Sequence, residues 1–404
     1  MIKTKRINIL IILIILLMNS NLFLNSQIFK IIMPPPQLDV DIYSYNKILI
    51  KWDKINVEKK NPEFKIRIIK ITGTSEEIIS ESDIYDKIYI DENLEQGIQY
   101  SYKAYFIYQG KKISDNSETI KISLPVTEYS FYVAGHVCGV PKVNNNGVHP
   151  PFKNKFDYIN YHPYIEFGVF TGDIVICSNF KNWDEIDMDL KLLNKPVYFS
   201  YGNHDYADPS LLISRYGPTY KSFIYNNDLF LILDSEIGPH NIKGDQLNFI
   251  KNELDSANDF RNIFVFVHKL IWISENSKYK ILEKKINSTT DYDFNSNFWN
   301  EIEPLFHGLK PKVYFFAGDL GVPWAIPAFY DHYDNIYFIA SGMGGNPEEN
   351  FLVVNVTNGD LIIEMIGLQD IQFKFSSIKD YNLKNISKIE LAEPIFLEEY
   401  ELND

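Results

Sequence analysis

Cysteine and positive charge are both scarce in this sequence. Its 404 residues include two cysteines, Cys138 and Cys177, so at most one disulfide can form within the chain, and free thiols are the alternative. Lys and Arg number 39 against 53 Asp and Glu, which gives a net charge of −14. Because no basic face is available to release counterions, we expect no nucleic-acid partner. The acidity indicates a solvated surface.

Residues 9–18 form an unbroken apolar run after Lys3, Lys5 and Arg6. This run is too short to span a hydrocarbon core of about 30 Å, but it suits the central region of a signal peptide. Residues 22–33 are still apolar and no Ala-x-Ala cleavage site is present, so an uncleaved membrane anchor is the alternative. We therefore expect residues 1–33 to direct export, giving a secreted, periplasmic or membrane-anchored protein.

Residues 34–125 are expected to form an all-β sandwich after a stiff linker of three prolines at 34–36. Short β-branched and aromatic runs alternate with turn residues at 47–52, 64–71, 87–90 and 100–108. Trp52, Leu94, Gly97 and Tyr100 resemble a fibronectin type III domain with its tyrosine corner. No cluster of catalytic side chains occurs here, so we expect this domain to be a spacer or a docking domain. Its partner could be a protein or a polysaccharide.

After Pro125 the pattern changes to strands that alternate with helices, which predicts an α/β domain over residues 126–370 and a C-terminal tail of unknown role over 371–404. Apolar residues at three- and four-residue spacing predict helices. The expected helices are 183–193, 246–254 and 298–306, and the later expected strands are 335–340, 351–356 and 361–366.

Five apolar runs in this part end in glycine or polar residues, at 131–139, 167–173, 196–205, 263–268 and 313–321. The third run stops at Gly202 and is followed by Asn203, His204 and Asp205. In open α/β sheets, ligands bind at the carboxyl ends of the strands, so polar side chains gathered there indicate a functional site.

The order and spacing of these runs resemble the calcineurin-like metallophosphoesterase family over roughly residues 128–368, with two of the family's five motifs intact. The resemblance implies a two-sheet β-sandwich flanked by helices. It also implies two metal ions about 3.5–4 Å apart that clamp a phosphoryl group and generate a hydroxide nucleophile. We therefore expect an exported metal-dependent phosphoesterase that hydrolyses a phosphate ester.

The resemblance assigns roles to the intact motifs. Asp173 would bridge the metals, and Asn203 would bind one of them through its amide oxygen. His204 would contact phosphate or protonate the leaving group, oriented by the carboxylate of Asp205. His268 matches the family's later single histidine and would be a metal ligand.

The first and last motifs depart from the family pattern. Histidine and cysteine, His136 and Cys138, stand for the usual aspartate and histidine, while Asp319 and Gly321 replace the two closing histidines. One metal position would keep Asp173, Asn203, His268 and Asp319, and the other would have His136, Cys138 and Asp173. The second set suits zinc. We expect one or two divalent ions, with zinc, manganese and iron all open.

Two alternatives follow from these departures. Cys138 and Cys177 could form a disulfide, which would withhold the thiolate from a metal. The chain could also be a catalytically degenerate member of the fold that acts as a cell-surface binding or accessory factor.

Two further residues are weaker candidates for contacts with substrate. His149 follows the first motif and could line the substrate site, with an ordinary surface loop as the alternative. Trp272 follows His268 by four residues and could form an aromatic wall beside the metals, with core packing as the alternative.

Overall fold

The computed structural model describes residues 33–53, 63–140, 146–207, 209–238, 240–275, 277–287 and 296–392. Its chain divides into two compact units, the first ending at Glu128 and also taking Val356–Ile362, the second holding the remainder. The predicted signal peptide or anchor lies outside the described residues, apart from Met33. Within the described ranges, no helix is both long enough and apolar enough to cross a membrane.

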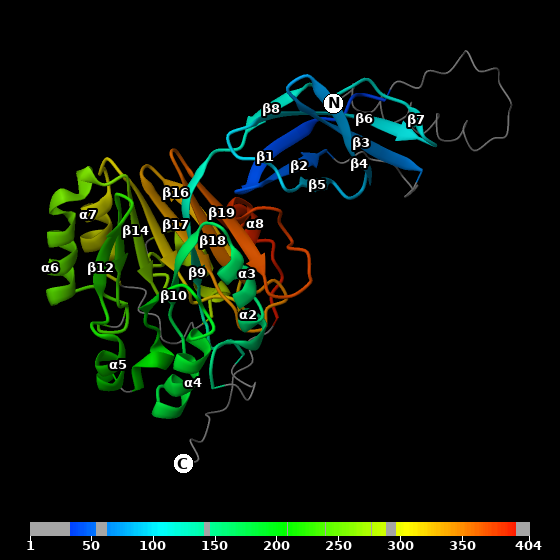
Figure 1. Cartoon of the computed structure of the whole chain (residues 1–404). Coiled ribbons are helices and arrows are strands. Elements are labelled where there is room, and N and C mark those ends of the chain that lie inside the picture. Colours follow the sequence, from blue (N-terminus) through cyan, green and yellow to red (C-terminus); the bar gives the residue numbers. More distant parts are fainter. Residues whose placement is uncertain are drawn as a thin grey trace, which may run out of the picture. The chain divides into compact units, whose positions relative to one another are not determined.

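The N-terminal unit is an all-β sandwich, as predicted (Figure 1). One sheet contains β1 (Leu38–Ser44), β2 (Lys47–Trp52) and β5 (Ile88–Asp91), and all of its pairs are antiparallel. The other has the order β4-β3-β6-β7, and β6 also pairs with β8. Its strands are β4 (Ser75–Asp83), β3 (Phe64–Thr72), β6 (Gln99–Tyr108), β7 (Lys111–Lys112) and β8 (Ile120–Ser123).

The core of this sandwich confirms the predicted tyrosine corner. Alternate residues of β6, among them Tyr100 and Tyr102, are buried, as expected for a strand with one face in the core. The Tyr100 hydroxyl accepts a hydrogen bond from the Glu95 amide at 2.9 Å, and Gly97 has a φ of 76° in the turn between them. Trp52 is buried and donates its indole N–H to the Ile84 carbonyl at 3.0 Å.

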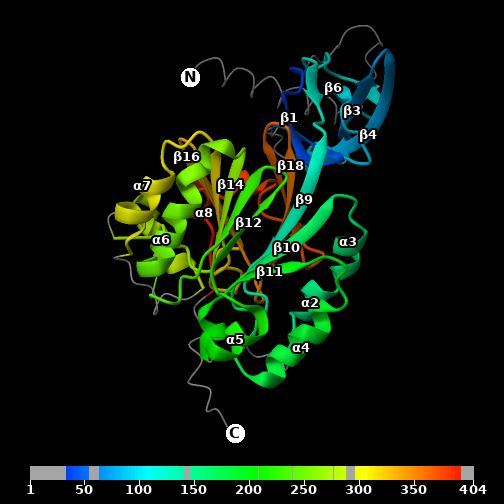
Figure 2. The same cartoon turned by 60° about the vertical axis from the view of Figure 1, so that its left-hand side comes forward.

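The second unit contains two sheets, each with neighbouring parallel strands (Figure 2). The five-stranded sheet has the order β11-β10-β9-β18-β19, in which β9, β10 and β11 are parallel. The six-stranded sheet has the order β12-β13-β14-β15-β17-β16, with antiparallel edge strands and parallel strands between them. The strands are β9 (Thr127–Ala134), β10 (Ile165–Thr171), β11 (Val197–Ser200), β12 (Lys221–Tyr225), β13 (Asp228–Ile232), β14 (Asn262–Val267), β15 (Lys312–Ala317), β16 (Ala328–Tyr333), β17 (Ile336–Ser341), β18 (Asn350–Thr357) and β19 (Leu361–Gly367).

Aromatic side chains join the two sheets face to face. Phe131 of β9 lies with its ring centroid 5.0 Å from that of Phe264 and 5.4 Å from that of Phe230, both on the six-stranded sheet. The next residue, Tyr132, points to the opposite face, where it packs with Phe152 and Phe170 under the helices. Successive side chains of β9 therefore pack alternately into the core between the two sheets and into the core under the helices.

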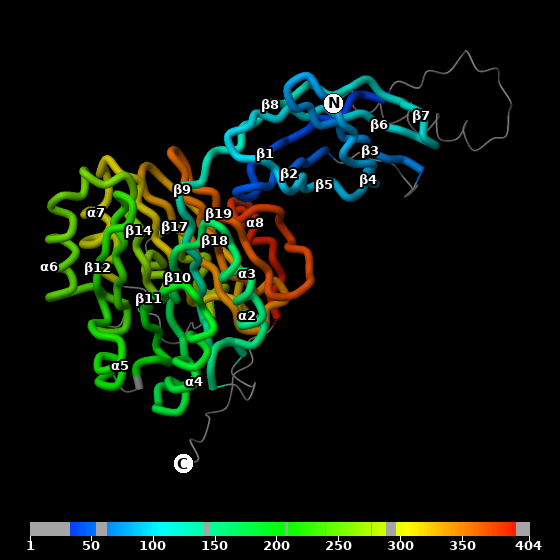
Figure 3. The backbone as a smooth tube through the Cα atoms, viewed as in Figure 1, coloured from blue at the N-terminus to red at the C-terminus, as the bar shows by residue number. Residues whose placement is uncertain are grey.

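Helices cover the outer faces of both sheets (Figure 3). The five-stranded sheet is covered by α2 (Pro150–Lys153), α3 (Phe156–Tyr161), α4 (Phe180–Leu190) and α5 (Pro209–Tyr216). On the other sheet lie α6 (Gly244–Glu253), the short turns Leu254–Asp259 and Lys278–Lys285, and α7 (Glu303–Phe306). The predicted helix 298–306 is a π-helical turn, Phe298–Ile302, followed by α7, because Pro304 has no amide hydrogen for a regular ladder.

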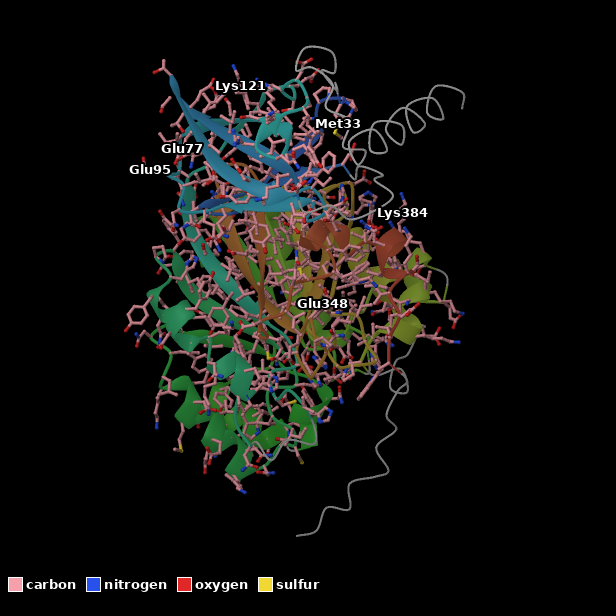
Figure 4. The ribbon with its side chains drawn as sticks, turned by 90° about the vertical axis from the view of Figure 1, so that its right-hand side faces the viewer. Met33, Glu77, Glu95, Lys121, Glu348 and Lys384 are labelled. Carbon is pink, nitrogen blue, oxygen red and sulfur yellow. The ribbon has the colours of Figure 1, made fainter. Side chains whose placement is uncertain are left out.

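The described part of the C-terminal tail docks onto the second unit. It forms a 3₁₀ turn, Ile378–Asp380, and α8 (Leu383–Ile386). The Tyr381 carbonyl accepts from the Tyr330 amide of β16 at 3.1 Å, and the Tyr381 hydroxyl donates to Glu348 at 2.9 Å. Figure 4 labels Glu348, which accepts from Tyr381, and Lys384 of α8. The tail thus completes the second unit as far as residue 392.

Asp228 ties three strands together at their amino ends, and its loss should destabilise the second unit. The carboxylate is fully buried and accepts from the Tyr129 hydroxyl, the Arg261 guanidinium and the Asn262 amide at 2.6–3.1 Å. We expect Asp228→Ala to lower the free energy of unfolding by about 3 kcal/mol, because buried donors lose a shared charged acceptor. Urea unfolding would measure this. The exposed control Asp370→Ala should stay within about 0.5 kcal/mol, and equal effects would contradict the assignment.

Candidate metal centre

Five loops meet at the carboxyl ends of β9, β10, β11, β14 and β15, and Asp173 lies at their centre. Its Oδ1 is 3.3 Å from the His268 Nε2 and accepts from the His204 amide at 3.3 Å. Its Oδ2 is 3.5 Å from the His136 Nε2. Residues from positions 136 to 268 of the sequence therefore converge on one buried carboxylate.

Glycines make this convergence possible. A Cβ at Gly202 would lie 2.2 Å from the Asp173 Oδ1, and a Cβ at Gly172 would lie 2.1 Å from the His268 Nδ1. Gly172 also has a φ of 86°, which L side chains rarely adopt. These two motif glycines let the loops approach the carboxylate and the imidazole more closely than any side chain would allow.

The backbone is held in an uncommon conformation at two positions of the centre. His136 and Asp173 directly follow the turns after β9 and β10, with φ values of 53° and 50°. Such conformations persist only where the surroundings enforce them, and they cluster at functional sites. Here the Gly172 carbonyl accepts from the His136 amide at 3.1 Å, which fixes one loop against the other.

Asp173, His268 and Asp319 form a group that could hold a metal ion. One ligand atom from each lies within 4.8 Å of the others, and all three side chains are buried. The His268 Nδ1 lies 2.9 Å from the Thr171 carbonyl, which orients the Nε2 toward the carboxylates. The His268 Nε2 has the Asp173 Oδ1 as its charged neighbour and lies 3.8 Å from the Asp319 Oδ1, which has no hydrogen-bond donor among the described residues. A carboxylate pair with an oriented imidazole fits a divalent cation.

The charge state of His268 reflects its two acidic neighbours. Burial alone lowers the pKa of this imidazole, but Asp173 and Asp319 outweigh it and raise the pKa to about 9. The ring therefore carries a proton at neutral pH when no metal is bound. A metal ion that binds the Nε2 must displace that proton.

Lys269, which sequence reasoning missed, is the fourth member of the centre. Its ammonium is fully buried and donates to the Asn203 Oδ1 at 2.7 Å and to the Asp319 Oδ2 at 3.0 Å. The predicted metal ligand Asn203 thus has its amide oxygen engaged by lysine. A signal was present in the sequence, since a lysine directly after a buried strand must find a partner for its charge.

Among the described residues, His136, Cys138 and Asp173 of the second predicted metal position do not form a group with the spacing of metal ligands. Cys138 is buried with its Sγ 3.9 Å from the Gly139 carbonyl, and burial raises the pKa of the thiol well above its ordinary value. Both cysteines are free, so the predicted disulfide alternative is absent from this structure. His136 lies beside Asp173 as expected, and burial lowers its pKa to about 4, so the imidazole is neutral, which is the form that binds a metal. A Cβ at Gly321 would lie 2.2 Å from the Gly342 backbone, so no side chain fits there.

Asp205 does not orient His204, which corrects the prediction. The Asp205 carboxylate accepts from the amides of Ile174, Val175 and Gly202 at 2.8–3.0 Å, so it joins the loops after β10 and β11. His204 is oriented instead by the carbonyl of Ile176, 2.8 Å from its Nδ1.

The protonated form of His204 is favoured by its charged neighbour. The Asp173 carboxylate raises the pKa of His204 above its ordinary value, although burial opposes this. His204 and Asn203 are only half-buried, whereas Asp173, His268 and Asp319 are buried. The two half-buried side chains therefore form the part of the centre nearest to solvent.

The two weaker candidates are structural. His149 is buried, not on a surface loop, and its Nε2 lies 3.2 Å from Glu349. Glu349 also accepts from the amides of Gly344 and Gly345 at 3.0 and 2.8 Å, so the pair holds the glycine loop that lies against His136. Trp272 is fully buried and stacks on Phe338 at 4.9 Å. Its side chain is therefore part of the core, which is the alternative that the sequence left open.

Comparison with known proteins finds similarity for the N-terminal unit. No family model matches the chain, and no curated protein matches it. Among solved structures, domains FN1–FN3 of chicken CNTN1 are 17% identical over 23% of this chain and 30% of theirs, with a TM-score of 0.20. The sixth fibronectin type III domain of human fibronectin type III domain containing protein 3 is 16% identical over 24% of this chain and 85% of its own, also at 0.20. Domains A168–A170 of titin are 14% identical, with 23% and 32% covered and a TM-score of 0.20. The chain thus spans about a third of the CNTN1 and titin structures.

Glu349 should make the second unit less stable in acid. Burial by itself raises the pKa of this carboxyl, but hydrogen bonds from His149, Gly344 and Gln369 lower it from 4.5 to about 2. Because the folded pKa is depressed, the stabilisation is complete above pH 4.5 and is lost as the pH falls toward 2. Glu349→Gln should therefore cost about 2 kcal/mol at pH 7, and the difference should shrink below pH 4.5.

Urea unfolding of both proteins between pH 7 and pH 3 measures the difference. The exposed Glu390→Gln serves as the control and should follow the wild type at every pH. A Glu349→Gln deficit that stays constant over this range would contradict the assignment.

Proposed function

We propose that the second unit is a metal-dependent phosphoric ester hydrolase of the calcineurin-like metallophosphoesterase type, behind an export or anchor segment and a fibronectin type III-like sandwich. One observation carries the proposal. The ends of β10, β14 and β15 bring Asp173, His268 and Asp319 together, and the buried Asp319 Oδ1 has no hydrogen-bond donor among the described residues. Buried polar atoms are normally satisfied, so this group is built for a ligand.

The metal chemistry would depend on three side chains. A divalent cation held by Asp173, His268 and Asp319 would supply a Lewis acid that acidifies water and polarises a phosphoryl oxygen. One imidazole and two carboxylates suit zinc, manganese or iron. The Thr171 carbonyl keeps the His268 ring in the orientation that such binding requires.

His204 would act on the substrate itself. It is half-buried beside Asp173, which favours its protonated form, and the Ile176 carbonyl holds its Nδ1. The remaining ring nitrogen can donate to a phosphate oxygen and then protonate the departing alcohol oxygen. The protonated form of His204, which Asp173 favours, suits an anionic substrate. Hydrolysis of a phosphate ester requires that an anion be bound and that the departing alcohol oxygen be protonated.

A second candidate is a catalytically degenerate accessory factor. It is favoured by the Lys269 ammonium on Asn203 and Asp319, and by the failure of Cys138 and Gly321 to complete a second metal position. In that case the N-terminal sandwich would dock a protein or polysaccharide at the cell surface.

Metal content and hydrolysis together test the hydrolase. Protein purified without chelator or a histidine tag should contain about one equivalent of a divalent metal and should hydrolyse bis(p-nitrophenyl) phosphate or p-nitrophenyl phosphate. Asp173→Ala should lose both properties, because it removes the carboxylate shared by the surrounding side chains. His204→Gln should keep the metal and lower kcat by about 100-fold.

The exposed His332→Gln is the matched control for His204→Gln and should leave metal content and kcat unchanged. A folded wild-type sample that takes up neither zinc nor manganese would exclude the hydrolase and leave the accessory factor as the function to pursue.

A further inference from the structure

Lys269 joins three strand ends through its ammonium group. The lysine follows His268 at the end of β14, while its partners Asn203 and Asp319 follow β11 and β15. All of the lysine side chain is buried. A fully buried lysine is rare and needs its charge compensated, so its placement here calls for a reason beyond packing.

The oxygens that surround the ammonium are of the kind that bind metals. An amide oxygen at 2.7 Å and a carboxylate oxygen at 3.0 Å would equally serve a divalent cation, and both belong to residues whose sequence pattern marks them as ligands. The ammonium therefore stands in a cation position, with a single fixed charge that cannot dissociate from the protein.

Asp319 divides its two oxygens between this ammonium and the rest of the centre. Its Oδ2 accepts from Lys269, whereas its Oδ1 faces the His268 Nε2 at 3.8 Å and has no hydrogen-bond donor in the part of the chain that the structure describes. One carboxylate thus lies between two cation positions. The first is filled by the lysine, and the second is the position of the proposed metal ion.

We propose that Lys269 is a resident cation that takes the place of one metal ion, so that the centre binds a single divalent metal beside a permanent ammonium. The inference rests on the proposed metal centre but concerns its composition. With the ammonium in place, the Asn203 and Asp319 Oδ2 oxygens are withheld from metal, and a second divalent ion meets a like charge.

Removing the lysine should open the second cation position. We expect wild-type protein equilibrated with excess Mn²⁺ to retain about one equivalent, and Lys269→Ala to retain about two, because the substitution frees two oxygens and the space of the side chain. Elemental analysis after equilibrium dialysis measures the stoichiometry, and circular dichroism verifies the fold. Lys280→Ala, which removes an exposed lysine paired with Glu275, is the matched control and should match the wild type.

The possible stoichiometries separate this inference from the proposed function. Two equivalents in the wild type, or one in both proteins, would overturn the resident cation while leaving a metal-dependent enzyme intact. No metal in the wild type but one equivalent in Lys269→Ala would overturn both the single-metal centre and the hydrolase. No metal in either folded protein would overturn both.

A measurement on the wild type alone covers the case in which Lys269→Ala does not fold. Electron paramagnetic resonance of the Mn²⁺-loaded wild type should give the six-line spectrum of isolated ions. A spectrum of two exchange-coupled Mn²⁺ ions would show both positions filled by metal and would overturn the proposal.

Discussion

The need to compensate two buried carboxylates shapes the second unit. Asp173 and Asp319 are both buried where the two sheets meet, and His268 lies within 3.8 Å of both. Like charges in a medium of low dielectric constant repel strongly, so positive partners are required. Lys269 and the imidazolium of His268 supply them in the metal-free protein, and they do so from consecutive positions at the end of one strand.

The sheets supply the geometry that this charge arrangement requires. Parallel strands end at a common edge, and motif glycines let their loops approach to distances at which a Cβ would clash. Asp205 then fixes two of the loops through three backbone amides, and Glu349 fixes the glycine loop beside His136. The loops around Asp173 are therefore held in place by buried polar contacts.

Strand ends could be predicted from the sequence because apolar runs that stop at glycine report burial and chain direction directly. The runs ending near Asp173, Asn203 and His268 became strands with the expected residues after them. Side-chain partners could not be predicted in the same way. His149 is paired with a glutamate 200 positions away, and Asp205 takes backbone amides in preference to the neighbouring imidazole. Such choices depend on how loops fold against one another, which local pattern does not encode.

Asp319 and Lys269 are best understood as one feature. The family that the sequence resembles has a histidine at the position of Asp319. A neutral imidazole has one nitrogen that can accept a hydrogen bond, and it has no charge to offset an ammonium. A carboxylate has two oxygens, and here one binds Lys269 while the other faces His268. With an apolar residue at 269, the Asp319 Oδ2 would be buried without the ammonium that offsets its charge. With histidine at 319, the Lys269 ammonium would lose the carboxylate of Asp319. Each of the two buried charges is therefore compensated by the other.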